Sequence, residues 1–313
     1  MNDRIIFEDV SKFYGEVLGV NRISLSIPPG ITTLVGPNGS GKTTMMNLMT
    51  GLIQPSSGSL SVLGLTPADA TEFFTAVGYC AQFDFFPRGI TGWDFLLDSL
   101  LLYGMEKAMA VDLAVAALDR VQLGDAARRK IAGYSKGMRQ KIRLAQAIAH
   151  HPRVLVLDEP LNGLDPMARA ESIALFEELG RQGMHVVISS HILDEVDRIS
   201  DRVILITGGY LIAEGNIHQV RQEVHEKPMQ VLIRCDHPEV LAAKMFSINH
   251  CVEARLHADG KGVFLRTADI DQFYSMLNRI VADGLVKIDA VAPADDDANA
   301  IYQYLIGSDG SAS

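Results

Sequence analysis

The stretch Gly36-Pro37-Asn38-Gly39-Ser40-Gly41-Lys42-Thr43 decides the fold, because it fits the phosphate-binding pattern G-x-x-x-x-G-K-[ST]. The run Ile31–Val35, with strand character, leads into it, and the run Thr44–Met49, with helical character, follows it. A glycine-rich turn that matched by accident would lack this strand–loop–helix context. Glycines let backbone N–H groups approach phosphate oxygens, and the helix N-terminus adds its positive dipole end. We therefore expect Lys42 to reach the β- and γ-phosphates of a nucleotide and the Thr43 hydroxyl to hold Mg²⁺.

The composition is that of a globular protein, with 48% hydrophobic and 21% charged residues in a chain of 313. The net charge of −10 argues against a dedicated nucleic-acid binder, which usually has a basic surface. Three cysteines without metal-ligand spacing indicate free thiols in a reducing compartment. We expect no signal peptide and no membrane-spanning helix, since no apolar run approaches the ~18 residues required. A function at a membrane would then need a second chain.

Two carboxylates follow a strand that is expected to be buried. Val154–Leu157 is a run of four apolar residues, typical of a strand covered on both faces, and Asp158 and Glu159 come directly after it. Open α/β sheets bind ligands at the carboxyl ends of such strands. A second buried strand, Val186–Ser190, ends before His191. Such a carboxylate pair is often a helix cap and such a histidine is often structural, but the upstream phosphate loop favours catalytic roles.

Alternating strands and helices over residues 31–206 predict a mostly parallel α/β sheet. Residues 4–35 predict a β-rich entry, and residues 93–124, with Leu, Ala and Met at helical spacing, predict a compact helical insertion. Arg202–Glu214 predicts a hairpin that turns at Gly208-Gly209.

The pattern restarts after the polar stretch Arg221–Pro228, which predicts a linker. The later elements follow the order βαββαβ, typical of a ferredoxin-like arrangement. We expect strands near residues 231–235, 250–256, 262–266 and 285–291, helices at 237–246, 269–282 and 295–305, and a disordered tail from 307. The predicted domains are residues 1–225 and an accessory α+β domain, 226–313, with a dimerisation or regulatory role and no catalytic constellation.

A series of motifs in fixed order resembles the nucleotide-binding subunit of ATP-binding-cassette (ABC) transporters over roughly residues 4–225. After the phosphate loop, the series consists of Gln82, Tyr134–Gln140, Asp158-Glu159-Pro160, Asp165 and His191. Its segment Tyr134-Ser135-Lys136-Gly137-Met138 departs from the commonest family signature, Leu-Ser-Gly-Gly-Gln, but keeps Ser135 and Gly137. This form resembles the branch of single-cassette subunits that pair with separate exporter-type permeases.

The resemblance implies a P-loop α/β cassette with a mixed sheet core, an antiparallel β entry and a helical insertion. It also implies that two cassettes meet head to tail, with each ATP between the phosphate loop of one and the Ser135/Gly137 loop of the other. Asp165 would lie at the dimer seam, and Tyr14, which alone would be an ordinary strand aromatic, aligns with the residue that stacks on adenine. The implied nucleotide-binding residues are Tyr14, Gly36, Pro37, Asn38, Gly39, Ser40, Gly41, Lys42, Thr43, Thr44, Ser135 and Gly137.

The resemblance also assigns the catalytic and metal-binding roles. Asp158 would bind Mg²⁺, directly or through water, together with Thr43 and Gln82. Glu159 would orient and deprotonate the attacking water, a role worth ~10²–10⁴ in rate. Gln82 would also contact this water and move with the permease, and His191 would sense the γ-phosphate through a hydrogen bond.

The implied function is ATP hydrolysis that drives export by a separate transmembrane permease, with the cassette as a homodimer on the cytoplasmic face of a membrane, such as a bacterial inner membrane. Two alternatives stay open: a soluble ABC-type ATPase that acts on nucleic acid or ribosomes, and a non-hydrolysing regulatory cassette. Basic residues between Arg128 and Arg143 would suit the first, but the single phosphate loop and the lack of a long heptad run argue against it. Gln82, Glu159 and His191 argue against the second. The cargo is chosen in the permease.

Overall fold

The computed structural model describes residues 3–82, 85–190, 199–200, 202–216, 229–246, 251–257, 259–267 and 270–293. These residues fall into two compact units, one up to residue 214 and one from residue 215 on. The expected domain boundary at residue 225, the predicted linker Arg221–Pro228 that contains it, the helix over 295–305 and the C-terminal tail lie outside the described residues.

A six-stranded sheet of order β5-β6-β7-β3-β8-β9 forms the centre of the first unit. Its strands are β3 (Gly30–Val35), β5 (Val77–Cys80), β6 (Val154–Leu157), β7 (His185–Ser190), β8 (Arg202–Thr207) and β9 (Tyr210–Asn216). The neighbours from β5 to β8 are parallel, so β3, β6 and β7 end at the same edge of the sheet. All four residues of β6 are buried, as their apolar run predicted.

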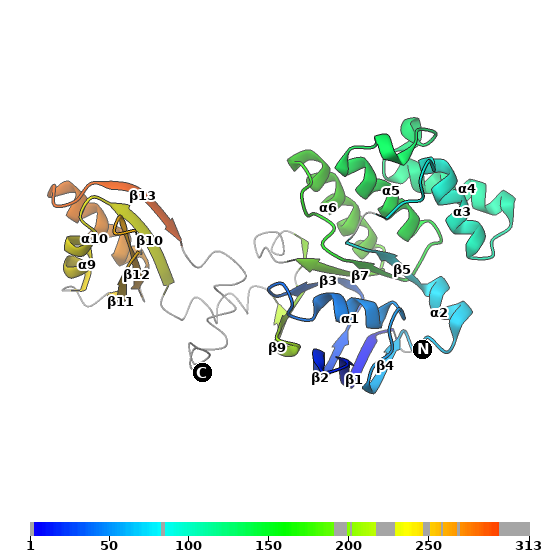
Figure 1. Cartoon of the computed structure of the whole chain (residues 1–313), viewed down its shortest axis with the longest axis horizontal. Helices are drawn as coiled ribbons and strands as arrows, with labels where there is room; N and C mark the ends of the chain where they lie inside the picture. Colours follow the sequence, from blue (N-terminus) through cyan, green and yellow to red (C-terminus); the bar gives the residue numbers. More distant parts are fainter. Residues whose placement is uncertain are drawn as a thin grey trace. The chain divides into compact units, whose positions relative to one another are not determined.

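Different layers cover the two faces of this sheet (Figure 1). Helix α1 (Lys42–Met49) lies on one face with an antiparallel sheet of order β2-β1-β4, formed by β1 (Ile5–Tyr14), β2 (Val17–Ile27) and β4 (Ser57–Val62). Helices α5 (Lys136–Ile148) and α6 (Pro166–Arg181) lie on the other face. Because side chains alternate along a strand, Val154 and Val156 pack with the α1 layer, whereas Leu155 and Leu157 pack with α5 and α6.

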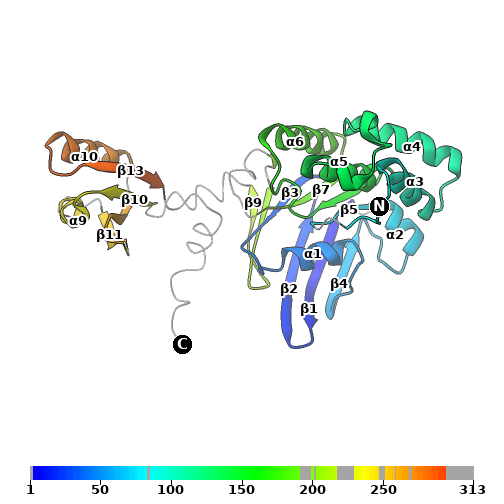
Figure 2. The same cartoon turned by 45° about the horizontal axis from the view of Figure 1, so that its top comes forward.

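The helical insertion consists of α3 (Gly92–Leu102) and α4 (Lys107–Arg120), which pack together and against α5 (Figure 2). A shorter helix, α2 (Ala70–Ala76), precedes β5. Helix α5 begins at Lys136, directly after Ser135, whose hydroxyl accepts a hydrogen bond from the Met138 N–H at 3.2 Å. This side chain satisfies one of the N–H groups that a helix N-terminus leaves without a partner.

The second unit contains an antiparallel sheet of order β11-β12-β10-β13 and two helices. In chain order these are β10 (Met229–Cys235), α9 (Pro238–Phe246), β11 (Cys251–Leu256), β12 (Gly262–Thr267), α10 (Ile270–Ala282) and β13 (Ile288–Pro293). The predicted βαββαβ order is therefore confirmed.

The expected strand over residues 285–291 is wrong in its position, because β13 begins only at Ile288. The N–H groups of Asp283, Gly284 and Leu285 donate to carbonyls of the last turn of α10, and Gly284 has a φ of 68°. This helix C-cap holds the chain near α10 up to residue 285 and delays the strand.

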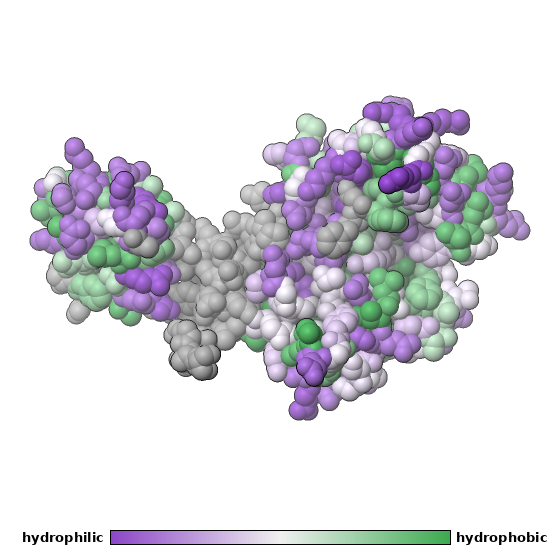
Figure 3. Space-filling view, in the orientation of Figure 1, coloured by the Kyte–Doolittle hydropathy of each residue, from purple (hydrophilic) through white to green (hydrophobic). Residues whose placement is uncertain are grey.

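No helix among the described residues is both long enough and apolar enough to cross a membrane. On the face shown in Figure 3, hydrophobic residues lie in patches between hydrophilic ones. Scattered exposed apolar side chains of this kind are normal for a globular surface.

Candidate active site

The phosphate loop connects the end of β3 to the start of α1, the strand–loop–helix context that the sequence predicted. Two of its glycines have positive φ, 79° at Gly39 and 108° at Gly41. A Cβ at Gly41 would lie 2.7 Å from the carbonyl oxygen of Gly19, and a Cβ at Gly36 would lie 2.2 Å from that of Ile206. Larger residues at these two positions would push neighbouring backbone away and disturb the loop.

Lys42 folds back over the loop that precedes it. Its Nζ donates hydrogen bonds to the carbonyl oxygens of Gly36 at 2.7 Å and of Pro37 at 3.0 Å. Burial lowers the pKa of the Lys42 ammonium, and the nearby carboxylates of Glu159 and Asp158 oppose that shift. The loop thus contains a partly desolvated cation whose present partners are backbone carbonyls.

Asp158 lies at the carboxyl end of β6 and joins the phosphate loop to the neighbouring strand β7. Its Oδ2 accepts a hydrogen bond from the Thr43 hydroxyl at 3.0 Å, and its Oδ1 accepts one from the Ser189 hydroxyl at 2.7 Å. Its backbone N–H donates to the Cys80 carbonyl at 2.9 Å. With 3% of its surface exposed, Asp158 is a buried carboxylate fixed from three directions.

Glu159 follows with a φ of 47°, a conformation that is uncommon for a residue other than glycine. Its backbone N–H donates to the Ser189 hydroxyl at 2.7 Å. Its side-chain Oε2 accepts hydrogen bonds from the amides of Gln82 at 2.9 Å and Asn162 at 3.1 Å. Backbone strain of this kind gathers at functional sites, where the surrounding structure holds it.

Two residues of this network, Ser189 and Asn162, were missed by the sequence analysis. Ser189 is the fifth residue of β7, and the register pairs Leu157 of β6 with Ile188 of β7, which brings Ser189 beside Asp158. A polar pair at the end of an otherwise apolar parallel strand was the signal that could have found it. Asn162 carries no signal beyond its closeness to Glu159 in the chain.

Tyr14 and Thr44 lie together beside the first turn of α1. The Tyr14 hydroxyl is 3.5 Å from Thr44 Oγ1, and Lys12 Nζ is 5.6 Å from the centre of the ring. The ring lies close to Gly19, where a Cβ would come within 2.9 Å of it. Tyr14 remains 46% exposed, which leaves aromatic surface accessible next to the helix that carries Lys42 and Thr43.

Ser135 and Gly137 lie at the N-terminus of α5, on the opposite face of the sheet from α1 (Figure 1). No described contact joins either residue to the phosphate loop of the same chain. The Asp165 carboxylate caps α6 by accepting a hydrogen bond from the Ala168 N–H at 2.9 Å. His191 lies outside the described residues. One chain therefore brings together the loop, Asp158, Glu159 and Gln82, and keeps the signature segment apart.

The residues present fit a nucleoside triphosphate with Mg²⁺. The Ser40 hydroxyl is buried without a hydrogen-bond partner in the described part of the chain. Thr43 and Asp158 offer a hydroxyl and a carboxylate, the hard oxygen ligands that Mg²⁺ prefers. Within the described ranges, no group of three His, Cys, Asp or Glu side chains could hold a metal. An ion that takes its remaining ligands from phosphate and water suits such a site.

Comparisons with known proteins agree with this geometry. The family model for ABC transporters matches residues 20–162. The chain is 31% identical over 308 residues to the bacitracin transport ATP-binding protein BcrA of Enterococcus faecalis, which covers 97% of each chain. It is 30% identical over 273 residues to the Nod factor export ATP-binding protein I of Rhizobium etli, which covers 86% of this chain and 84% of that one.

A solved dimeric ATP-binding cassette, in a post-hydrolysis state bound to ADP and Pi, has the same fold as the first unit. Its TM-score is 0.62 at 23% identity, over 68% of this chain and 98% of that one. The first unit thus has the fold of an ATP-binding cassette. The chain belongs to the family of ABC transporter ATP-binding proteins, and its relatives include proteins named for bacitracin transport and Nod factor export.

Proposed function

We propose that two identical copies of this chain hydrolyse ATP between them and drive a separate transmembrane permease in the direction of export. The observation that carries this proposal is the hydrogen-bonded path from Thr43 through Asp158 and Ser189 to Glu159. The path links the predicted phosphate site to a carboxylate that can act on water. The names of the relatives in Enterococcus faecalis and Rhizobium etli support transport and export respectively.

The phosphates of ATP would lie in the loop and its adenine on Tyr14. Lys42 would exchange its contacts with the Gly36 and Pro37 carbonyls for contacts with phosphate oxygens, and the negative charge of the nucleotide would favour its protonated form. The unpartnered Ser40 hydroxyl would gain a phosphate oxygen as its acceptor. Stacking on an exposed aromatic ring contributes about 1–3 kcal/mol per base in other nucleotide-binding proteins.

Thr43, Asp158 and Gln82 would hold Mg²⁺. The bound ion would neutralise the charge that develops on the phosphate oxygens. The Thr43 hydroxyl donates a hydrogen bond to the Asp158 carboxylate at 3.0 Å, so the two proposed ligands lie side by side. The Ser189 hydroxyl holds the other carboxylate oxygen, which would keep Asp158 aimed at this position.

Glu159 is the proposed general base. The amides of Gln82 and Asn162 donate to one of its carboxylate oxygens, which fixes the direction of the carboxylate. Glu159 would accept a proton from water as that water attacks the γ-phosphorus, and ADP would leave with the bridging oxygen. General base catalysis of this kind contributes about 10²–10⁴ in rate. His191 remains a proposed γ-phosphate sensor.

The second copy would supply the other half of each site. Ser135 and Gly137 begin α5, so a γ-phosphate presented to them would meet a hydroxyl, backbone N–H groups and the positive end of a 13-residue helix. Among the described contacts, none joins these groups to the phosphate loop of their own chain, which supports a site shared between copies. Asp165, at the start of α6, is the proposed seam residue.

An apolar cavity near Gln82 is the proposed docking place for the permease. It has a volume of about 380 Å³, and Leu52, Phe74, Phe85 and Tyr103 are among the residues that line it. Phe85 is 88% exposed, so most of its ring is available to a partner protein. Ala81, which directly precedes Gln82, also lines the cavity, so a segment bound there could shift Gln82 and Glu159 together.

Three basic residues of α5 make contacts within the cassette, which supports a cassette without a nucleic-acid partner. Arg139 donates to the Tyr134 carbonyl at 2.9 Å, and Arg143 donates to the Ala81 carbonyl at 2.7 Å. Lys141 forms an ion pair with Glu171 at 2.8 Å. These cations are engaged within the cassette, whereas nucleic-acid binding relies on basic side chains presented to phosphates. The proposed location is the cytoplasmic face of a membrane, reached through the permease.

Two variants test this function. Glu159→Gln keeps the size of the side chain but removes the base, so steady-state phosphate release should fall at least about 100-fold while ATP still binds. Turnover at the wild-type rate would remove Glu159 from its role. Ser135→Ala should weaken ATP-dependent pairing of two chains, measured by sedimentation with and without ATP. Pairing as strong as in the wild type would count against the shared site.

A further inference from the structure

Strand β11 forms an edge of the C-terminal sheet, and within the described residues only β12 pairs with it. Apolar side chains are exposed along this edge, with Val252 at 59% and Leu256 at 53%. Helix α9 packs against β11 and β12, and its Phe246 is 48% exposed. An exposed edge with apolar side chains is a template for pairing with another strand.

The backbone of β11 presents hydrogen-bonding groups away from the sheet. The N–H of His257 donates to the Gly262 carbonyl at 2.8 Å, which makes these two residues a hydrogen-bonded pair of the β11–β12 ladder. The N–H and C=O groups of successive residues point to alternate sides of an antiparallel strand. The groups of Glu253, four residues before His257, therefore also point to β12. The N–H and C=O groups of Ala254 and Leu256 point outwards, where a further strand could bind them.

The sequence of this edge is self-complementary. Residues 252–256 read Val-Glu-Ala-Arg-Leu. Opposite charges therefore flank Ala254 on its two sides, and an apolar residue lies beyond each of them. If two copies pair antiparallel around a two-fold axis at Ala254, Glu253 of each copy lies directly opposite Arg255 of the other. These would be non-hydrogen-bonded pairs, in which the Cα atoms are only about 4.5 Å apart and side chains interact most closely.

Both charged side chains lie on the face of the sheet away from the core. Glu253 pairs in register with Arg266, with 3.6 Å between their charged groups, and Arg255 lies 5.2 Å from the centre of the Phe264 ring. A register shift between Cys251 and Glu253 bends the strand at its start, so the pairing is centred on residues 253–255.

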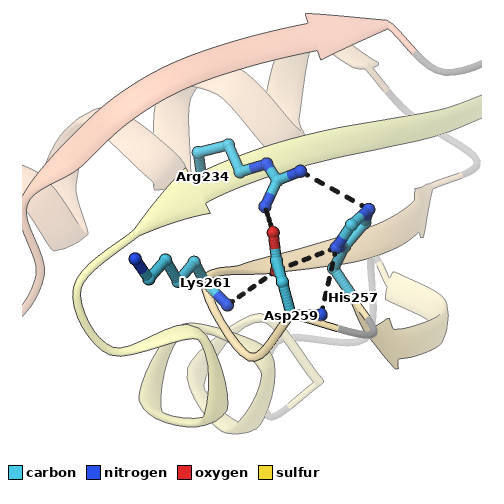
Figure 4. Close-up of polar contacts among 4 residues, drawn as sticks. All are labelled: Arg234, His257, Asp259 and Lys261. Carbon is cyan, nitrogen blue, oxygen red and sulfur yellow. Dashed lines mark hydrogen bonds and ion pairs between the residues drawn. The ribbon is translucent and has the colours of Figure 1, made fainter.

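A network of polar contacts fixes the end of this strand, at the turn into β12 (Figure 4). The Asp259 carboxylate contacts the Arg234 guanidinium, accepts a hydrogen bond from the Lys261 N–H at 2.9 Å and lies 2.8 Å from His257 Nδ1. The Lys261 N–H and Arg234 hold the pKa of Asp259 well below its usual range. The carboxylate therefore stays charged near neutral pH, and the edge strand has a defined geometry before any partner binds.

We infer that β11 is a self-association strand, through which two copies of this chain pair edge to edge and join their C-terminal sheets. This pairing goes beyond the proposed function, because it needs no nucleotide and uses no residue of the ATP site. The other edge strand, β13, does not offer the same match, since Asp289 is its one charged residue and it ends in a proline. The mirrored charges of β11 instead favour an identical strand.

Charge reversal tests this pairing on the full chain without nucleotide, by sedimentation equilibrium. Glu253→Arg would place Arg opposite Arg in its own dimer, and Arg255→Glu would place Glu opposite Glu, so each variant should dimerise at least about tenfold more weakly. An equimolar mixture of the two variants should dimerise again, because every cross-strand pair would then be Arg with Glu. Thermal unfolding of each variant checks that its fold is intact.

Three results would overturn the inference: a wild-type chain that stays monomeric at about 100 µM, reversals that leave dimerisation unchanged, or a mixture that fails to recover it.

A disulfide provides a second measurement. On the two-fold axis, residue 254 of one copy would face residue 254 of the other in a hydrogen-bonded pair. The two cysteines of the Ala254→Cys variant would then have their Cα atoms about 5.5 Å apart, within the range for a disulfide. It should cross-link two chains under mild oxidation, whereas Val291→Cys on β13 should not, and the three native cysteines are buried. Absent or equal cross-linking would contradict the inference.

The outcome is separable from that of the proposed function. Sedimentation without ATP reports β11 pairing, and the change on adding ATP to the Arg255→Glu variant reports pairing of the cassettes through Ser135. Either association can be lost while the other remains.

Discussion

The Ser189 hydroxyl holds the Asp158 carboxylate and the backbone N–H of Glu159, and Ser189→Ala should therefore weaken stability and activity together. The hydroxyl donates to Asp158 Oδ1 at 2.7 Å and accepts from the Glu159 N–H at 2.7 Å. Ser189 itself is 1% exposed, so water cannot simply replace its side chain. Alanine removes both contacts and introduces no new group.

The expected size of the effect follows from these two hydrogen bonds. A hydrogen bond to a charged group contributes about 1.5–3 kcal/mol, and a buried donor left unpaired costs about 1–3 kcal/mol. Since one hydroxyl makes both contacts and Glu159 is only half-buried, we expect a loss of about 2–4 kcal/mol in the free energy of unfolding. For a unit of this size, that loss lowers Tm by about 5–15 °C.

Activity should fall as well, because Asp158 and Glu159 would lose the group that aligns them. A misplacement of about 1 Å at a catalytic group can cost on the order of 10²-fold in rate. The assays are thermal unfolding by circular dichroism and steady-state phosphate release at saturating ATP. Ser172→Ala is the matched control, since this buried hydroxyl donates only to the Ala168 carbonyl of its own helix at 2.8 Å. If both variants gave the same Tm and kcat, the role assigned to Ser189 would be wrong.

Three further predictions concern the cassette. Gly41→Ala should abolish ATP binding and lower Tm. Gly183→Ala, also at positive φ but in open space, should cost only about 1–2 kcal/mol, and equal effects would contradict the steric argument. Tyr14→Leu should weaken ATP affinity about tenfold and Tyr14→Phe should not, as measured with a fluorescent ATP analogue; equal affinities would exclude stacking. Burial lowers the pKa of His150 and His185, so the unfolded chain binds protons first as the pH falls below about 6.5. Tm should therefore decrease below that pH, with a shallower slope in His150→Leu, and an unchanged slope would refute the assignment to His150.

Local patterns were sufficient to predict the parts of the site that are continuous in sequence. The phosphate loop needs glycines and a lysine at fixed spacing, because its conformation depends on neighbours a few residues away. The position of Asp158 and Glu159 followed from the buried run Val154–Leu157, since four apolar residues in succession are typical of a parallel strand covered on both faces.

The parts that could not be predicted depend on contacts between distant segments. Ser189 lies 31 residues from Asp158 in sequence and meets it only because β6 and β7 pair in one register. A serine at a strand end is common, so its identity alone carries no signal. The start of β13 was misplaced for a related reason: the cap of α10 around Gly284 competes with the strand for the same residues.

The two proposed associations would affect each other in a measurable way. A β11 pair keeps two chains together, so the closing of their cassettes around ATP becomes an intramolecular step with a high effective concentration. ATP turnover per wild-type chain should then stay constant as the protein is diluted, down to the Kd of the β11 pair. Arg255→Glu, which lies outside the ATP site, should instead lose turnover per chain on dilution at much higher concentrations, and should reach the wild-type rate when concentrated.

The mixture of Glu253→Arg and Arg255→Glu is the control for this dilution experiment, because it restores the complementary charges without changing the cassette. It should recover turnover that is independent of dilution. If turnover depended on concentration equally in the wild type, Arg255→Glu and the mixture, the cassettes would associate independently of the C-terminal unit. The accessory domain would then need a different role, and the mirrored charges around Ala254 would serve only as a charged edge that discourages aggregation.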